Sequence, residues 1–228
     1  MSEYDRDRIL KELPGPTYWT QACEDLSGRD PVLAGLIRMH GTDVLRGSGN
    51  AFRTLVNAIV GQQISVAAAD GIWKRLNTAF PGLLPYALAA ADLAELRGLG
   101  LSWRKADYIR GISEAFATGA IDDTMWADFS DAQVHSELTA LRGIGPWTAD
   151  MVLIFHLQRP DILPLGDIGL VNAAAKLYTW DIHEELSNTA RLAARRERLS
   201  VHAERWRPWR TVATWYIWRD LDAEPVIY

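Results

Sequence analysis

The sequence predicts an all-α protein, and three observations support this prediction. Apolar residues recur at the spacing of amphipathic helices through most of the chain. Serine, aspartate or asparagine stands just before several of these segments, where helices prefer a capping side chain. No segment keeps the two-residue alternation that is typical of a half-buried strand.

The expected helices follow one another from residue 17 to residue 220. Asn50, Ser65 and Ser130 each precede a segment with helical spacing, and Pro146 suits the first turn of a helix. Pro85 is expected to close the segment that Ser65 begins. The expected positions are 17–26, 31–40, 52–60, 66–80, 92–96, 103–118, a helix after Ser130, one from Pro146, one from Asp167, and 209–220.

Size and composition limit the class of protein. The 228 residues suffice for one large domain or two small ones. No run of about 18 apolar residues occurs and the first residues lack the apolar core of a signal peptide, so we expect no membrane span. The single cysteine, Cys23, excludes an intrachain disulfide, a four-cysteine zinc site and an all-cysteine iron–sulfur cluster. An intracellular location is the simplest expectation.

Charge leaves two readings of a basic segment open. The net charge of −5 by itself argues against a nucleic-acid partner. Residues 191–210, however, hold seven arginines against two glutamates. Arginine suits bidentate contacts with phosphate, but a solvated helix face explains such a run about as well.

The segment 141–170 carries the strongest signal of function. It opens with Leu-Arg-Gly-Ile-Gly at 141–145, directly before the helix that Pro146 begins. Two glycines at a helix N-terminus offer clustered N–H groups and the positive end of the helix dipole, which together suit a DNA phosphate. The helix itself is apolar on nearly every side, so we expect it to be buried.

Asp167 lies at the other end of this segment, at the expected start of a second helix. Aspartate is a common N-cap, and a carboxylate that accepts backbone N–H bonds stays ionised at neutral pH. An ionised carboxylate also suits the stabilisation of an oxocarbenium ion. The capping role and the catalytic role are therefore compatible.

Two further features each permit a structural or a functional interpretation. Residues 96–100 repeat the Leu-Arg-Gly-x-Gly pattern of 141–145, and we interpret this first copy as an ordinary helix C-terminus. In the last helix, Trp215 and Trp218 are adjacent on a face that also holds Thr211. That face is either a second core contact or the aromatic wall of a pocket.

Taken together, these segments resemble the helix–hairpin–helix/Gly-Pro-Asp DNA glycosylase superfamily. The resemblance is strongest to its alkylation-repair branch, the 3-methyladenine DNA glycosylase II (AlkA-type) family. It rests on Asn-Ala-Ile-Val-Gly-Gln-Gln-Ile-Ser at 57–65, Leu-Arg-Gly-Ile-Gly-Pro-Trp-Thr-Ala at 141–149, the Asp167 segment, and Arg-Trp-Arg-Pro-Trp-Arg at 205–210.

The resemblance implies roles for individual residues. Asp167 would be the catalytic carboxylate, and Gly143, Gly145 and Thr148 would give backbone amides to a phosphate near the lesion. Hairpin carbonyls would suit a structural monovalent cation (Na⁺ or K⁺), although no cofactor is required. The carbonyls in question belong to Thr139, Leu141 and Ile144.

The resemblance also assigns a wedge and a base pocket. Gln63, with Gln62 beside it, matches the position that enters the duplex where the base is extruded. Trp218 and Trp147 would line the base pocket. The N-terminal helices offer further pocket candidates: Tyr18, Trp19 and Met39.

Trp147 indicates which chemistry to expect. Relatives that also cleave the DNA strand carry a lysine nucleophile two residues past the second glycine, and tryptophan has no amine. Neither Lys105 nor Lys176 lies at the matching place. The resemblance therefore implies a monofunctional glycosylase without AP-lyase activity.

The expected architecture is two helical subdomains, 1–48 with 165–228 and 49–164, with the active site in the cleft between them. The expected enzyme flips alkylated purines of the 3-methyladenine and 7-methylguanine type out of double-stranded DNA and hydrolyses the N-glycosidic bond in base excision repair. Uracil, mismatched or oxidised bases are an alternative substrate class, and a non-catalytic helix–hairpin–helix DNA-binding module is another alternative. We expect a monomer without a membrane partner, in the cytoplasm at the nucleoid, or in the nucleus of a eukaryote.

Overall fold

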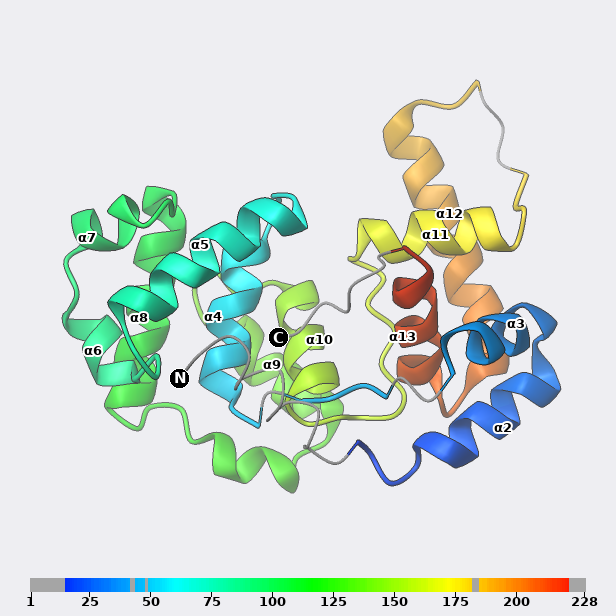
Figure 1. Cartoon of the computed structure of the whole chain (residues 1–228), viewed down its shortest axis with the longest axis horizontal. Helices are drawn as coiled ribbons and strands as arrows, with labels where there is room; N and C mark the ends of the chain where they lie inside the picture. The colour runs from blue at the N-terminus through cyan, green and yellow to red at the C-terminus, as the bar shows by residue number, and fades with distance from the viewer. Residues whose placement is uncertain (1–14, 42–43, 48, 182–184, 222–228) are drawn as a thin grey trace. The chain divides into compact units, whose positions relative to one another are not determined.

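The computed structural model describes residues 15–41, 44–47, 49–181 and 185–221 (Figure 1). Every regular element in these ranges is a helix, which confirms the predicted all-α class. The chain divides into two compact units, one of Met1–Gly47 with Gln158–Ile227 and one of Ser48–Leu157. Among the described residues, no helix is both long enough and apolar enough to cross a bilayer.

The first unit combines helices from both ends of the chain. Helix α13 lies against α3 and α11, and its residues 211–217 are all buried. Asp30 caps α3 through the N–H groups of Val32 and Leu33 and also accepts bonds from Tyr178 and Trp206, so one carboxylate joins three parts of this unit. The elements are α2 (Trp19–Arg29), α3 (Pro31–His40), α11 (Ile168–Leu177), α12 (Asn188–His202), η2 (Ala203–Trp206) and α13 (Arg210–Leu221).

Two details of this unit differ from the sequence prediction. Helix α2 continues through 27–29, beyond the helix end expected at residue 26. Asp30 alone makes the turn, because its N–H donates to Leu26 O while its side chain caps α3. The unit also resumes at Gln158 rather than at 165. The segment that follows is held by α13, through Thr211 N to Pro160 O (3.0 Å) and the Arg210–Asp161 ion pair.

The second unit is organised around the buried helix α10. Residues 151–155 of α10 are almost inaccessible to solvent, and the helix packs on α4 and α9, as its apolar sequence predicts. Side chains of Asn50, Ser65, Asp92, Ser102 and Ser130 cap helices here. The elements are α4 (Ala51–Gly61), α5 (Val66–Ala79), α6 (Pro85–Ala90), α7 (Leu93–Gly98), α8 (Trp103–Ala117), η1 (Asp123–Ala127), α9 (Asp131–Thr139) and α10 (Pro146–Phe155).

Pro85 begins a helix instead of ending one. It occupies the first position of α6, where a proline loses no hydrogen bond because the first N–H groups of a helix have no partner within it. Helix α6 packs along α8, and Leu88 is fully buried. The expectation that Pro85 only closes the preceding segment is therefore wrong.

Candidate functional site

Asp167 is the N-cap of α11. Its N–H donates to Pro164 O (2.9 Å), and its Oδ1 accepts the N–H of Leu170 (2.7 Å). These two bonds set the carboxylate at the first turn of the helix, where the dipole favours a negative charge. The side chain remains partly exposed.

Gly169 makes room for this carboxylate. A Cβ added at Gly169 would lie 3.2 Å from Asp167 Oδ1, closer than an ordinary van der Waals contact. Leu221 Cδ1 lies on the same side, at 3.7 Å from that Cβ position. A glycine two residues after Asp167 was not singled out from the sequence, because nothing in the pattern shows where the cap side chain turns.

The hairpin between α9 and α10 has the backbone that its glycines suggest. Gly143 adopts φ +93°, a conformation that favours glycine, and Ile144 N donates to Leu141 O at 3.1 Å. Gly145 is the N-cap of α10, with its carbonyl bonded to Ala149 N (3.1 Å). The first turn of α10, which includes Thr148, thus begins directly at the hairpin.

Gln62 and Gln63 follow α4 and point to different surroundings. Gln62 Nε2 donates to Gly143 O (3.2 Å) and to Thr148 Oγ1 (3.0 Å), so the side chain of Gln62 is bound to the hairpin. Gln63 is exposed and has φ +58°. Lys105 fixes the end of α4 with bonds to Val60 O (2.8 Å) and Gln62 O (2.7 Å), and its partial burial lowers the pKa of its ammonium group.

The tryptophans assigned to the base pocket have different environments. Trp147, in the first turn of α10, and Trp218, near the end of α13, are both half-buried. Trp215 is only 5% exposed and meets Trp19 edge-on, with ring centroids 6.4 Å apart. On the face that Trp215 and Trp218 share, Trp215 therefore belongs to the core of the first unit.

The N-terminal pocket candidates are mostly engaged in the first unit. Trp19 is 5% exposed and donates to Tyr216 Oη at 3.4 Å. Tyr18 stacks on Trp209 and donates its hydroxyl to Gln158 O at 2.7 Å. Met39 is 72% exposed. The packing of Tyr18 and Trp19 is structural, and their role at a base stays a prediction.

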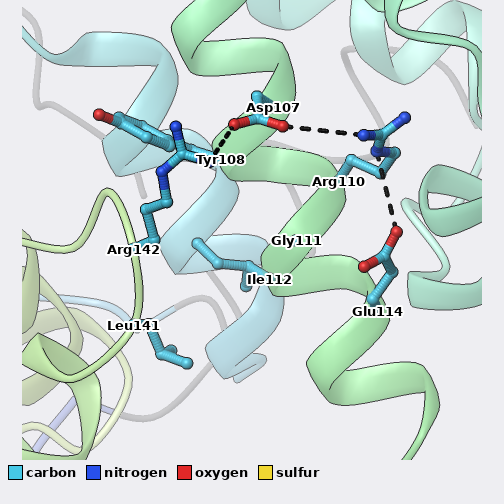
Figure 2. A pocket seen from close by; sticks show the side chains of 8 residues that line it. All are labelled: Asp107, Tyr108, Arg110, Gly111, Ile112, Glu114, Leu141 and Arg142. Atoms are coloured by element: carbon cyan, nitrogen blue, oxygen red, sulfur yellow. Dashed lines mark ion pairs between the residues drawn. The ribbon is translucent and has the colours of Figure 1, made fainter.

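A small pocket lies beside the hairpin (Figure 2). Arg142 extends over the ring of Tyr108, 5.8 Å from its centroid, and pairs with Asp107 at 2.8 Å. Arg110 and Glu114 complete a chain of ion pairs along α8. The pocket, of about 230 Å³, is thus lined by charges that already neutralise one another.

Asp150 lies on α10 near the hairpin and is half-buried. Desolvation raises the pKa of its carboxyl group to about 7. His135, on α9, faces it, with Nε2 3.9 Å from Oδ1. The two helices that flank the hairpin therefore carry facing titratable groups, which sequence reasoning missed because Asp150 lies in an otherwise apolar helix.

The hairpin carbonyls of Thr139, Leu141 and Ile144 lie at the turn between α9 and α10. Thr139 is the last residue of α9, where helix carbonyls lack intrahelical partners. Leu141 O accepts a turn bond from Ile144 N. No group of three or more histidine, cysteine, aspartate or glutamate side chains suited to a metal ion occurs in the described part of the chain.

Comparison with known proteins shows the family of this chain. Residues 56–196 match the model of the HhH-GPD superfamily base excision DNA repair proteins. The chain is 31% identical to DNA-3-methyladenine glycosylase 1 of Schizosaccharomyces pombe, over 89% of this chain and 88% of that protein.

Two solved structures have a similar fold. One is 3-methyladenine DNA glycosylase from Schizosaccharomyces pombe in complex with abasic DNA (TM-score 0.75, 27% identity, 87% of this chain and 95% of that one). The other is DNA-3-methyladenine glycosidase from Bacillus halodurans (TM-score 0.69, 33% identity, 87% and 88%). The chain therefore belongs to the HhH-GPD superfamily of base excision DNA repair proteins.

Proposed function

We propose that this protein is a monofunctional DNA glycosylase that removes alkylated purines from double-stranded DNA. The observation that carries the proposal is the combination of an N-cap carboxylate, Asp167, with a glycine hairpin at the N-terminus of α10. Relatives named 3-methyladenine DNA glycosylases cover most of the chain, which supports the substrate class.

In the proposed mechanism the hairpin holds the DNA backbone. The amides at Gly143, Gly145 and Thr148 bind a phosphate at the positive end of α10. Such a contact carries no sequence information, as a repair enzyme that scans DNA requires. Gln63, exposed at the end of α4, enters the duplex at the place of the extruded nucleotide.

Asp167 then acts on the extruded nucleotide. The bond between C1′ and the base nitrogen breaks, the electron pair leaves with the base, and the carboxylate stabilises the positive charge that develops on the sugar. Water adds to C1′ and loses a proton. An alkylated purine already carries a positive charge, so it leaves as a neutral base without a strong general acid.

Aromatic residues complete the proposed site. Trp147 and Trp218 are half-buried and serve as walls for the flipped base. A cationic base on an indole gains about 0.5–2 kcal/mol. Because Trp147 supplies no amine for a Schiff base, the reaction stops at an abasic site with the DNA strand intact.

The remaining parts of the proposal concern partners and location. A sodium or potassium ion bound by the carbonyls of Thr139, Leu141 and Ile144 would stiffen the hairpin without taking part in the reaction. We propose a monomer that works on chromosomal DNA, at the nucleoid in a bacterium or in the nucleus of a eukaryote.

A chromatographic assay of the bases released from methylated duplex DNA tests the proposal. The wild type is expected to release 3-methyladenine and 7-methylguanine, and Asp167→Asn to release neither while duplex affinity changes little. Release at the wild-type rate by Asp167→Asn would show that the catalytic assignment is wrong. A panel of duplexes that each carry one uracil, mismatched or oxidised base tests the other substrate class, which release from these duplexes alone would favour. Duplex binding with no released base from any substrate favours a binding module.

A further inference from the structure

The side chain of Lys105 caps the C-terminal end of α4. Its ammonium group donates to Val60 O at 2.8 Å and to Gln62 O at 2.7 Å. The last carbonyls of a helix have no partner within the helix, and a cation there also faces the negative end of the dipole. Lys105 lies in the first turn of α8, so it joins α8 to the residue that directly precedes Gln63.

This contact lies on the peptide group that determines the position of Gln63. The peptide group that carries the carbonyl of Gln62 also contains the nitrogen of Gln63. Gln63 has φ +58°, which is uncommon for a residue with a side chain and persists only where the surroundings hold it. The bond from Lys105 to Gln62 O restrains this peptide group, and the side chain of Gln63 remains exposed.

The side chain of Gln62 supplies a second restraint. Its Nε2 donates to Gly143 O at 3.2 Å and to Thr148 Oγ1 at 3.0 Å. Thr148 is 1% exposed, so this end of the link is buried within the second unit. The links run from Lys105 to the backbone of Gln62, and from the side chain of Gln62 to the hairpin.

We propose that Lys105 is a positioning residue for base flipping, which together with Gln62 holds Gln63 in a fixed place relative to the hairpin. The inference rests on the proposed function, in which Gln63 is the wedge and the hairpin binds a phosphate. The wedge must enter the duplex at a set distance from that phosphate, and a small misplacement of a positioned group lowers rates strongly. Lysine suits the task because its compact ammonium group can donate to two carbonyls at once.

A capping role alone makes a different prediction from a positioning role. If Lys105 only stabilises α4, its loss lowers the amount of folded protein and affects every substrate alike. If it positions Gln63, its loss affects substrates whose damaged base must be driven out of the helix. A base without a pairing partner costs less to extrude, so it depends less on the wedge.

The test compares single-turnover excision of 7-methylguanine from two DNA duplexes. One is fully paired, and in the other the damaged base faces an abasic site. For Lys105→Met we expect excision from the paired duplex to fall about tenfold, as for the loss of a hydrogen-bonded charge, and excision from the second duplex to change less than about twofold. Gln63→Ala should show the same pattern. In the double variant the two losses should not add, because both act through one loop.

Controls separate the possible failures. Lys74→Met removes an exposed lysine of α5 in the same unit and should behave as wild type on both duplexes. Gln62→Leu keeps the cap on α4 but breaks the link to the hairpin, so it should reproduce the pattern if Lys105→Met does not fold. Equal losses on both duplexes, or additive losses in the double variant, would overturn the inference while wild-type excision upholds the proposed function. If the wild type releases no base from either duplex, the proposed function fails instead.

Discussion

The ring of Tyr108 occupies the space that a side chain on Gly143 would need. A Cβ built on Gly143 would lie 2.2 Å from Cγ of Tyr108, and Gly143 also has φ +93°. Helix α8, which carries Tyr108, therefore packs directly against the first glycine of the hairpin. Gly145, two residues later, has φ −96°, and a Cβ built on it would have no neighbouring heavy atom within 4 Å.

These two glycines predict opposite outcomes for the same substitution. Gly143→Ala forces either the hairpin or Tyr108 to move, and we expect a loss of unfolding free energy of about 1–3 kcal/mol together with weaker duplex binding. Gly145→Ala keeps its amide and meets nothing, so it should stay within about 1 kcal/mol of wild type. Urea unfolding and a duplex titration at one fixed salt concentration measure both. Equal effects of the two substitutions would contradict this account of the hairpin.

A methyl group on Gly169 should separate activity from stability. The added Cβ would lie 3.2 Å from Asp167 Oδ1, so the carboxylate must shift by a few tenths of an ångström. We expect Gly169→Ala to lower the rate of base release about threefold to tenfold, since catalysis depends on the placement of the reacting groups. Stability should be unchanged or rise by up to about 1 kcal/mol, because alanine favours a helix over glycine.

Gly28→Ala is the matched control for Gly169→Ala. Gly28 also lies in a helix of the first unit, and nothing approaches the Cβ position within 4 Å. It should show the gain in stability without any loss in single-turnover excision. If Gly169→Ala excises bases as fast as Gly28→Ala, the crowding of Asp167 has no catalytic consequence.

The buried carboxylate of Asp30 should be essential to the first unit. Asp30 is 1% exposed and accepts from Leu33 N (3.2 Å), Tyr178 Oη (2.9 Å) and Trp206 Nε1 (2.9 Å). Asp30→Ala leaves these donors without their acceptor, and we expect a loss of about 3–5 kcal/mol of unfolding free energy. Urea unfolding monitored by tryptophan fluorescence measures it. A loss under about 1 kcal/mol would show that the donors find other acceptors.

The pKa of Asp30 adds a dependence on acid. Burial raises the pKa, but the hydrogen bonds from Trp206, Tyr178 and Leu33 outweigh it and hold the pKa below its usual value of 3.8. The unfolded state therefore binds the proton more readily than the folded state. This contribution to stability is complete above about pH 4 and is lost as the pH falls through the folded-state pKa.

Local sequence signals predicted most of the helices because capping is a local matter. Ser65 and Ser130 accept backbone N–H bonds where the pattern predicted helix starts, and Pro146 begins α10. Pro85 was misjudged because a proline suits both the end of one helix and the first turn of the next. Only the burial of Leu88 against α8 decides between them, and that contact is not local.

The sequence and the resemblance named candidate site residues, but they did not predict the contacts that these residues make. The resemblance pointed to Gln62 and Gln63 together, yet the structure binds the Gln62 side chain to the hairpin and leaves Gln63 exposed. Lys105 carried no signal because its partners are carbonyls, which every residue has. The contact of Tyr108 was unpredictable for a similar reason, because its ring packs against Gly143, which has no side chain to indicate a partner.

Asp150 should make the second unit less stable at alkaline pH. Burial raises the pKa of its carboxyl group from 3.8 to about 7, so between these values the folded state binds a proton that the unfolded state has lost. The penalty for ionising the half-buried carboxyl group appears as the pH rises through about 4 and is complete above about 7. At about 1.4 kcal/mol for each pKa unit, it is on the order of 4 kcal/mol at most.

Urea unfolding of wild type and Asp150→Asn between pH 5 and pH 8.5 tests this prediction. Asparagine has nearly the same shape and no charge, so the variant should gain stability relative to wild type as the pH rises. His135 faces the carboxyl group, with Nε2 3.9 Å from Oδ1. His135→Gln removes the facing imidazole, so the same comparison in this background should isolate Asp150. A constant difference between variant and wild type across the whole range would mean that the carboxyl group does not titrate there.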